Sequence, residues 1–114
     1  MPPDPQELLP LPMATFHILL ALSDQERHGY SIMREVAVRS DGEVRIGPAT
    51  LYTTIKRLLG EGLIEELEER PDPDADDQRR RYYRLSTFGR QVAHAELNRL
   101  QALVRQAKST LARG

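Results

Sequence analysis

The 114-residue sequence contains no cysteine, no long hydrophobic run and almost no net charge. The absence of cysteine excludes disulfides, thiolate metal sites and cysteine nucleophiles, and it suits a reducing cytosol. Because no apolar run reaches about 18 residues, we expect no transmembrane helix. The first residues lack the basic region and apolar stretch of a signal peptide, so we expect a cytoplasmic protein with one domain.

The net charge of −1, taken alone, argues against binding to nucleic acid, but the charges are unevenly distributed. Residues 63–78 contain eight acidic residues and one arginine, whereas residues 79–90 contain five arginines and no acidic residue. Such blocks create separate electrostatic surfaces, and a local basic surface is what contact with phosphate requires. The distribution therefore keeps nucleic-acid binding open.

The order of predicted elements is two helices, a short strand, a third helix, a β-hairpin and a long helix. Four of the eight prolines lie in residues 1–10, and we expect residues 1–11 to form a flexible arm. The expected bounds are 12–23 and 28–39 for two helices, 44–46 for the strand, 48–61 for the third helix, 63–70 and 79–85 for the hairpin, and 86 to near the C-terminus for the last helix. Three helices followed by a two-stranded wing form a winged helix-turn-helix, whose third helix enters the major groove of DNA. We therefore predict a mainly α (α+β) fold, with a winged-helix DNA-binding domain over residues 12–85 and a C-terminal dimerisation helix over residues 86–114.

The last predicted helix carries an apolar seam whose spacing alternates between four and three residues. Such a heptad pattern favours packing against another helix, either in the same chain or in a second subunit. We expect the seam to contact both the first helix of its own chain and a partner, which predicts a homodimer. The residues of this expected dimer interface are Ala93, Leu97, Leu100, Val104, Ala107 and Leu111.

Three groups of short stretches carry a family resemblance. They are residues 28–32 (HGYSI), residues 46–52 (IGPATLY) with 56–58 (KRL) and 62–65 (GLIE), and residues 81–86 (RYYRLS) with 89–90 (GR). Together they resemble the PadR-like transcriptional regulators, in that family's order and roughly its spacing. The resemblance implies a homodimeric winged-helix regulator, usually a repressor, of the short form in which one helix follows the wing and pairs two subunits.

The exposed face of the third predicted helix is the first candidate for contact with DNA. Its hydroxyl and basic side chains can contact phosphates or base edges, although an ordinary solvated helix face has a similar composition. The resemblance favours contact with DNA. The residues expected to make it are Thr50, Tyr52, Thr53, Lys56 and Arg57.

The arginines of the second hairpin strand are the other candidate. Arg79, Arg80 and Arg81 are expected to contact phosphates or the minor groove. The alternative is that they pair across the hairpin with Glu65, Glu66, Glu68 and Glu69, which the geometry of neighbouring strands permits. Both can hold for different arginines.

Metal binding and catalysis find little support in the sequence. The acidic residues 72–77 suggest a calcium loop, but Asp77 and Tyr83 stand where such a loop needs glycine and a bidentate glutamate. The three histidines are dispersed, and no catalytic triad or glycine-rich phosphate loop is present. We expect no metal, no cofactor and no enzymatic activity.

We therefore predict a cytoplasmic, homodimeric DNA-binding transcriptional regulator, expected to be a repressor that binds a palindromic double-stranded operator. The alternative is a winged-helix adaptor that binds protein without specific DNA binding, which the acidic residues 65–77 favour. Some relatives bind small effectors, but nothing in this chain identifies an effector.

Overall fold

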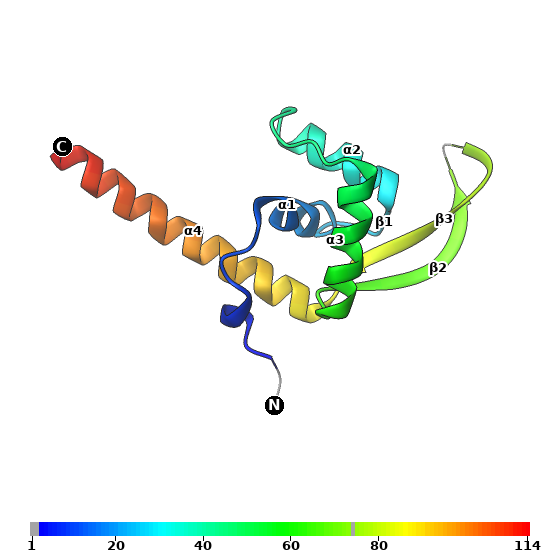
Figure 1. Cartoon of the computed structure of the whole chain (residues 1–114), viewed down its shortest axis with the longest axis horizontal. Coiled ribbons are helices and arrows are strands. Elements are labelled where there is room, and N and C mark those ends of the chain that lie inside the picture. The colour runs from blue at the N-terminus through cyan, green and yellow to red at the C-terminus, as the bar shows by residue number, and fades with distance from the viewer. Residues whose placement is uncertain (1–2, 74) are drawn as a thin grey trace.

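The computed structural model describes residues 3–73 and 75–114, with side chains for all of these except residues 75–78. The elements are η1 (Pro5–Leu8), α1 (Met13–Ala21), β1 (Arg27–His28), α2 (Gly29–Arg39), α3 (Pro48–Gly60), β2 (Ile64–Asp72), β3 (Ala75–Leu85) and α4 (Thr87–Arg113). The helices α1, α2 and α3 form a central body, from which the β2–β3 hairpin projects on one side and α4 on the other (Figure 1). The chain is therefore elongated, with extents of 59 × 39 × 23 Å. This is the winged helix-turn-helix that the pattern of elements predicts.

The sheet has three antiparallel strands in the order β1-β3-β2. Its third strand is Arg27–His28, which pairs with Tyr83 and Tyr82 of β3. The expected strand at residues 44–46 is wrong, because Val44 donates its backbone N–H to the Ser40 side chain at 2.9 Å instead of joining a sheet. A short alternating pattern does not determine whether a partner strand is within reach.

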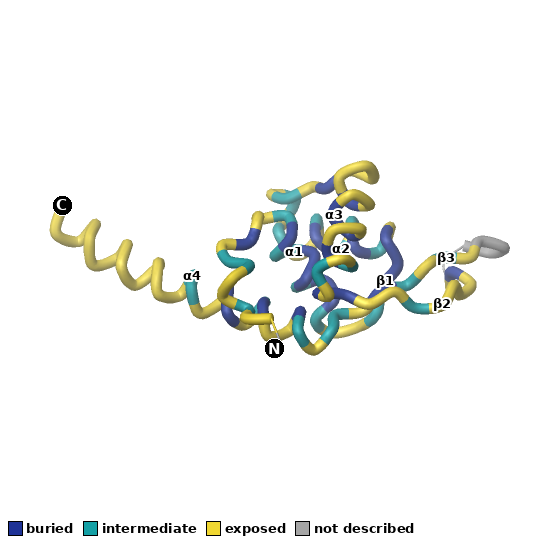
Figure 2. Tube along the Cα trace, turned by 60° about the horizontal axis from the view of Figure 1, so that its bottom comes forward, coloured by how far each residue is buried: buried dark blue, intermediate teal, exposed yellow. Residues whose placement is uncertain are grey.

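The hydrophobic core lies where α1, α2, α3 and the first turns of α4 meet (Figure 2). The pattern that predicts the helices also predicts their buried faces. The fully buried apolar side chains include Ile18, Leu19, Ile32, Leu51, Leu58 and Val92. The buried face of α3 packs in this core, and the opposite face of α3 lies in solvent.

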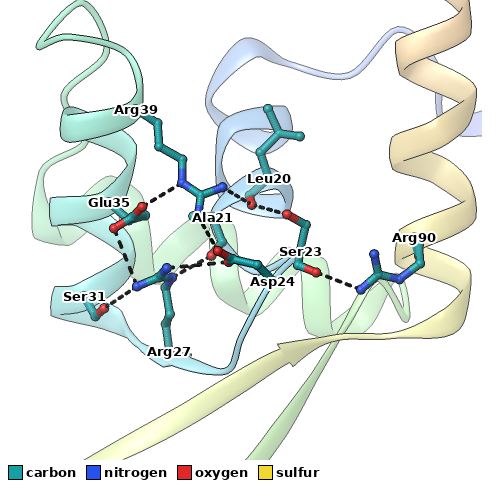
Figure 3. A network of polar contacts seen from close by, with 9 residues as sticks. All are labelled: Leu20, Ala21, Ser23, Asp24, Arg27, Ser31, Glu35, Arg39 and Arg90. Carbon is teal, nitrogen blue, oxygen red and sulfur yellow. Dashed lines mark hydrogen bonds and ion pairs between the residues drawn. The ribbon is translucent and has the colours of Figure 1, made fainter.

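The end of α1 is held by three arginines from other parts of the chain (Figure 3). The last carbonyls of a helix have no partner within the helix and must be satisfied elsewhere. Arg39 donates to the carbonyl of Leu20, Arg27 to that of Ala21, and Arg90 of α4 to that of Ser23 in the following turn. These bonds fix α1 against β1, α2 and α4.

The N-terminal segment is packed against the protein over the residues described. Leu8 and Leu9 lie against the core, and Leu11 is 9% exposed. The backbone N–H of Leu11 donates to a carboxylate oxygen of Glu96 on α4 at 3.0 Å. Residues 4–11, expected to belong to a flexible arm, therefore contact the body of the protein, because the leucines bury apolar surface that the proline content does not reveal. Met1 and Pro2 lie outside the described residues.

The helix α4 begins in the body of the protein and then leaves it. Ser86 caps it by accepting a hydrogen bond from the backbone N–H of Gly89 at 2.8 Å, as the sequence predicts. Val92, Ala95 and Glu96 are buried, whereas every residue from 101 to 114 is exposed (Figure 2). The second half of this helix therefore has no contact that buries it within the chain.

Candidate nucleic-acid interface

The helix α3 presents the polar face that the sequence predicts. Gly47 is the N-cap, proline occupies the first turn, and Gly62 follows the helix with a φ of +73°. Leu51, Ile55 and Leu58 are buried on the inner side. The exposed residues include all five that are expected to contact DNA, Thr50, Tyr52, Thr53, Lys56 and Arg57.

Tyr52 connects this face to two other elements. Its hydroxyl lies so close to Gly29, at the start of α2, that an added Cβ on Gly29 would be 2.7 Å from it. Burial raises the pKa of Tyr83 on β3, and the neighbouring Glu66 and Tyr52 raise it further. Tyr52 therefore lies at the junction of α3, the start of α2 and the wing.

The two basic residues of α3 have different surroundings. The guanidinium of Arg57 donates to the hydroxyl of Thr15 at 2.6 Å and pairs with Glu61 at 3.1 Å. Lys56 is exposed and forms no hydrogen bond or ion pair with any described residue. Lys56 can therefore bind a phosphate without losing another contact, whereas Arg57 must first break its bonds to Thr15 and Glu61.

The wing arginines bond to the neighbouring strand. Arg80 pairs with Asp72 at 3.1 Å, and Arg81 pairs with Glu66 at 3.2 Å. Arg79 donates to the backbone carbonyl of Glu69 at 3.0 Å. Among these three arginines, only Arg81 pairs with glutamates of the set expected from the sequence, and no partner of Glu68 is found among the described residues. The pairs of Arg81 are exposed and contribute no more than about 1 kcal/mol, so a phosphate can displace them, whereas Asp72 is buried and holds Arg80 more firmly.

Asp72 is a residue whose role sequence reasoning missed. The outer part of the wing bends back toward the body (Figure 1), and the side chain of Asp72 is only 4% exposed. It lies 3.7 Å from Nε2 of His28 and also accepts from Arg80. No local pattern marks this contact, because it joins distant segments. Asp74 and the side chains of Asp76 and Asp77, which belong to the supposed calcium loop, lie outside the described residues.

Arg45 is a further cation that sequence reasoning did not single out. It is exposed just before α3, and its guanidinium would lie 3.3 Å from a Cβ added to Gly42. With Tyr30, Met33 and Arg34 it lines an open groove beside α2. Its position in the sequence could have identified it, because it lies two residues before the Gly47 N-cap and so places a charge next to the start of α3.

The apolar seam of α4 is divided between the core and solvent. Ala93 packs against the core of its own chain, and Leu100 is half-buried. Leu97, Val104 and Leu111 are 43%, 51% and 78% exposed. The inner end of the seam therefore contacts the rest of the chain, and the outer end leaves apolar surface uncovered.

Neither a metal site nor a membrane-spanning helix is found in the described part of the chain. It contains no group of three or more histidine, aspartate or glutamate side chains arranged to hold a metal ion. None of its helices has both the length and the apolar character needed to cross a membrane.

The fold defines a class of protein, the winged helix-turn-helix proteins, and similar solved structures belong to it. A PadR family transcription regulator from Clostridium difficile aligns with a TM-score of 0.72 and 21% identity, over 88% of this chain and 99% of that one. Bacillus subtilis PadR in complex with operator DNA aligns with a TM-score of 0.62 and 24% identity, over 77% of this chain and 48% of that one. At these identities the likeness concerns the fold.

Sequence comparison gives the family. Residues 18–95 match the family described as "Transcriptional regulator PadR-like family", and the chain belongs to it. Transcriptional regulator Rv3488 of Mycobacterium tuberculosis is 33% identical over 90 residues, which are 79% of this chain and 78% of that protein. An uncharacterised protein of Lysinibacillus sphaericus is 32% identical over 73 residues, 64% of each chain. The protein is thus a transcriptional regulator and not an enzyme, as the sequence predicts.

Proposed function

We propose that the protein binds a palindromic DNA operator as a homodimer in the cytoplasm and represses transcription by occupying it. The observation that carries this proposal is the exposed face of α3, where Thr50, Thr53 and Lys56 project into solvent beside Tyr52 and Lys56 pairs with no described residue. In a winged helix-turn-helix, this helix enters the major groove. The complex of Bacillus subtilis PadR with operator DNA supports the same use of the fold.

The wing adds a second contact in this proposal. Arg79, Arg80 and Arg81 lie on β3. Arg79 and Arg81 can exchange their exposed partners on β2 for a phosphate, whereas Arg80 would have to leave the buried Asp72. Arg57 can likewise contact a phosphate only after it leaves Thr15 and Glu61, to which it is bonded in the free protein. The basic contacts are therefore of two kinds, with Lys56 available at once and the arginines released on binding.

The helix α4 provides the dimer. Its uncovered residues Leu97, Val104 and Leu111 lie on the predicted seam, and full burial of such a side chain contributes roughly 1.5–3 kcal/mol. A second copy of α4 covers this surface with a complementary seam. In this proposal residues 12–85 form the DNA-binding unit, residues 86–114 form the dimerisation helix, and the angle between two copies of α4 sets the spacing of the half-sites.

The described part of the wing gives the adaptor alternative less support than the sequence does. This alternative depends on free acidic residues in the wing, yet Glu65, Glu66, Glu69 and Asp72 all pair with arginines of β3. The surface that they form is therefore closer to neutral than the sequence suggests.

Selection of binding sites from a pool of random duplex DNA tests the proposal. We expect enrichment of one palindromic sequence, with binding that weakens steeply as salt rises because phosphate contacts release counterions. Sedimentation with the enriched duplex should give two chains per duplex. If no duplex is enriched at low salt, the adaptor function is the better explanation.

A further inference from the structure

The four arginines of β3 all bond to the opposite strand of the wing. Arg84 pairs with Glu65 at 3.3 Å, Arg81 with Glu66 and Glu69, and Arg80 with Asp72, while Arg79 donates to a backbone carbonyl. A basic strand that would attract any phosphate is thus held by carboxylates from its own hairpin.

Arg81 is the arginine whose position matters most for DNA. Side chains alternate along a strand, so Arg81 lies on the same face of β3 as Tyr83. Tyr83 is buried on the side of the sheet where Tyr52 of α3 influences its ionisation. Arg81 therefore lies on the wing face that is nearer to Tyr52 of α3.

A β-bulge brings two carboxylates to this one arginine. The register of β2 against β3 shifts between Glu66 and Glu69, which inserts an extra residue into β2. As a result, Glu66 lies 3.2 Å and Glu69 3.6 Å from the guanidinium of Arg81. The hydrogen bond that Arg81 donates to Glu66 raises the pKa of Arg81, in keeping with a guanidinium stabilised by anionic neighbours.

Because Arg81 is paired, it can bind a phosphate of DNA only if that phosphate replaces Glu66 and Glu69. The side chains of Arg81, Glu66 and Glu69 are 52%, 40% and 52% exposed, and ion pairs so close to water are weak. A phosphate held at a fixed position can replace the carboxylates, because an arginine bonds a phosphate at least as well as a carboxylate. In a non-specific complex the phosphates are not held at a fixed position, so they compete less well with the two carboxylates for Arg81.

We propose that Glu66 and Glu69 are specificity-determining residues, which keep Arg81 from non-specific DNA and release it where α3 is seated in its operator. This inference rests on the proposed function, since it needs a duplex that the protein prefers. Its consequence is that the wing contributes one more phosphate contact to the operator complex than to the non-specific complex.

The test compares Glu66→Gln/Glu69→Gln with wild type on the enriched duplex and on a scrambled duplex of equal length, over a series of salt concentrations. On the scrambled duplex the variant should bind about fivefold tighter at low salt, the upper range for exposed pairs. There its slope of log K against log salt should steepen by about 0.9, the value for one added phosphate contact. On the enriched duplex the slope should not change, so the ratio between the two affinities should fall.

Two further variants establish that the effect passes through Arg81. In an Arg81→Gln background, the two glutamate substitutions should no longer steepen the slope. Glu68→Gln is the charge control, because Glu68 lies on the same strand, is exposed, and pairs with no described residue. Equal steepening with Glu68→Gln, steepening without Arg81, or an unchanged slope in the double variant would each overturn the inference. Failure of the wild type to enrich any duplex would instead overturn the proposed function.

Discussion

The hydroxyl of Tyr52 packs over Gly29, and this contact leaves no room for a side chain on the glycine. A Cβ at that position would lie 2.7 Å from the hydroxyl oxygen and 3.0 Å from the ring carbon that carries it. Gly29 belongs to the first family-like stretch of the sequence and Tyr52 to the second. The two stretches therefore act together, because the start of α2 supports an aromatic side chain of α3.

Replacing Gly29 with alanine should displace Tyr52 and weaken DNA binding several-fold. The fold should survive, because the clash is with the end of a flexible side chain, which can move away. Binding titrations on the enriched duplex and thermal unfolding measure the two effects. In a Tyr52→Phe background, where the closest atom is removed, Gly29→Ala should cost less affinity. An equal loss in both backgrounds would show that Tyr52 is not the cause.

A second glycine, Gly89, should be far less tolerant. A Cβ there would overlap the backbone carbonyl oxygen of Leu63, which cannot move without disturbing β2 and the start of α4. We expect Gly89→Ala to lower the free energy of unfolding by about 3 kcal/mol or more, as overpacking does. Gly60→Ala is the matched control, since nothing lies within 4 Å of its added Cβ. It should leave stability unchanged or raise it by up to about 1 kcal/mol. Urea denaturation that ranks the two variants equally would contradict this account.

On α3, Thr53 and Lys56 should affect DNA binding in different ways. Lys56→Ala should weaken binding to all sequences and reduce the salt slope by about 0.9, because one phosphate contact is lost. Thr53→Ala should change which bases are preferred, since its hydroxyl projects from the same face toward base edges. Lys108→Ala, an exposed cation on α4, controls for the charge. If repeated selection and salt titration show no change with either α3 variant, a different face of the protein contacts DNA.

The outer seam of α4 should control the oligomeric state. Val104→Asp places a charge on a seam position that is 51% exposed in the single chain, so the fold should be unaffected. In a dimer the same carboxylate would be buried without a partner, which is costly. We expect the variant to sediment as a monomer with its helical circular dichroism retained. Gln106→Asp, on the other side of the helix, should remain dimeric. A monomeric wild type, or equal behaviour of the two variants, would exclude this seam as the interface.

Glu96 should make the protein sensitive to acid. Its hydrogen bond with Arg99 lowers its pKa below the ordinary value of 4.5, and the N–H of Leu11 acts in the same direction. The ionised form therefore favours the fold, so this stability is present above the ordinary pKa and is lost as the pH falls through the lowered one. Glu96→Gln should be less stable than wild type at neutral pH, and the difference should shrink in acid. Denaturation curves that keep a constant difference at every pH would contradict this expectation.

Local sequence signals determined the elements that carry the proposed interface. Pro48 and Gly62 mark the two ends of α3, Ser86 marks the start of α4, and the apolar spacing separates the buried face of α3 from its exposed face. These signals can be interpreted from one sequence because each acts through hydrogen bonds or side chains within one or two helical turns. The apolar seam of α4 can be read from the sequence in the same way, and its outer residues Leu97, Val104 and Leu111 are exposed in the structure.

Tertiary structure alone decided the contacts between distant segments. Arg57 bonds to Thr15 of α1, and Asp72 reaches His28 from the far end of the wing. The N-terminal leucines pack beside Glu96, although their proline-rich surroundings suggest a loose arm. A charged or apolar side chain has many potential partners of the right chemistry, and only the folded arrangement of helices and strands brings one of them within reach. For that reason the sequence indicated which residues face solvent on α3, while the fold determined which basic residues are free and which are held.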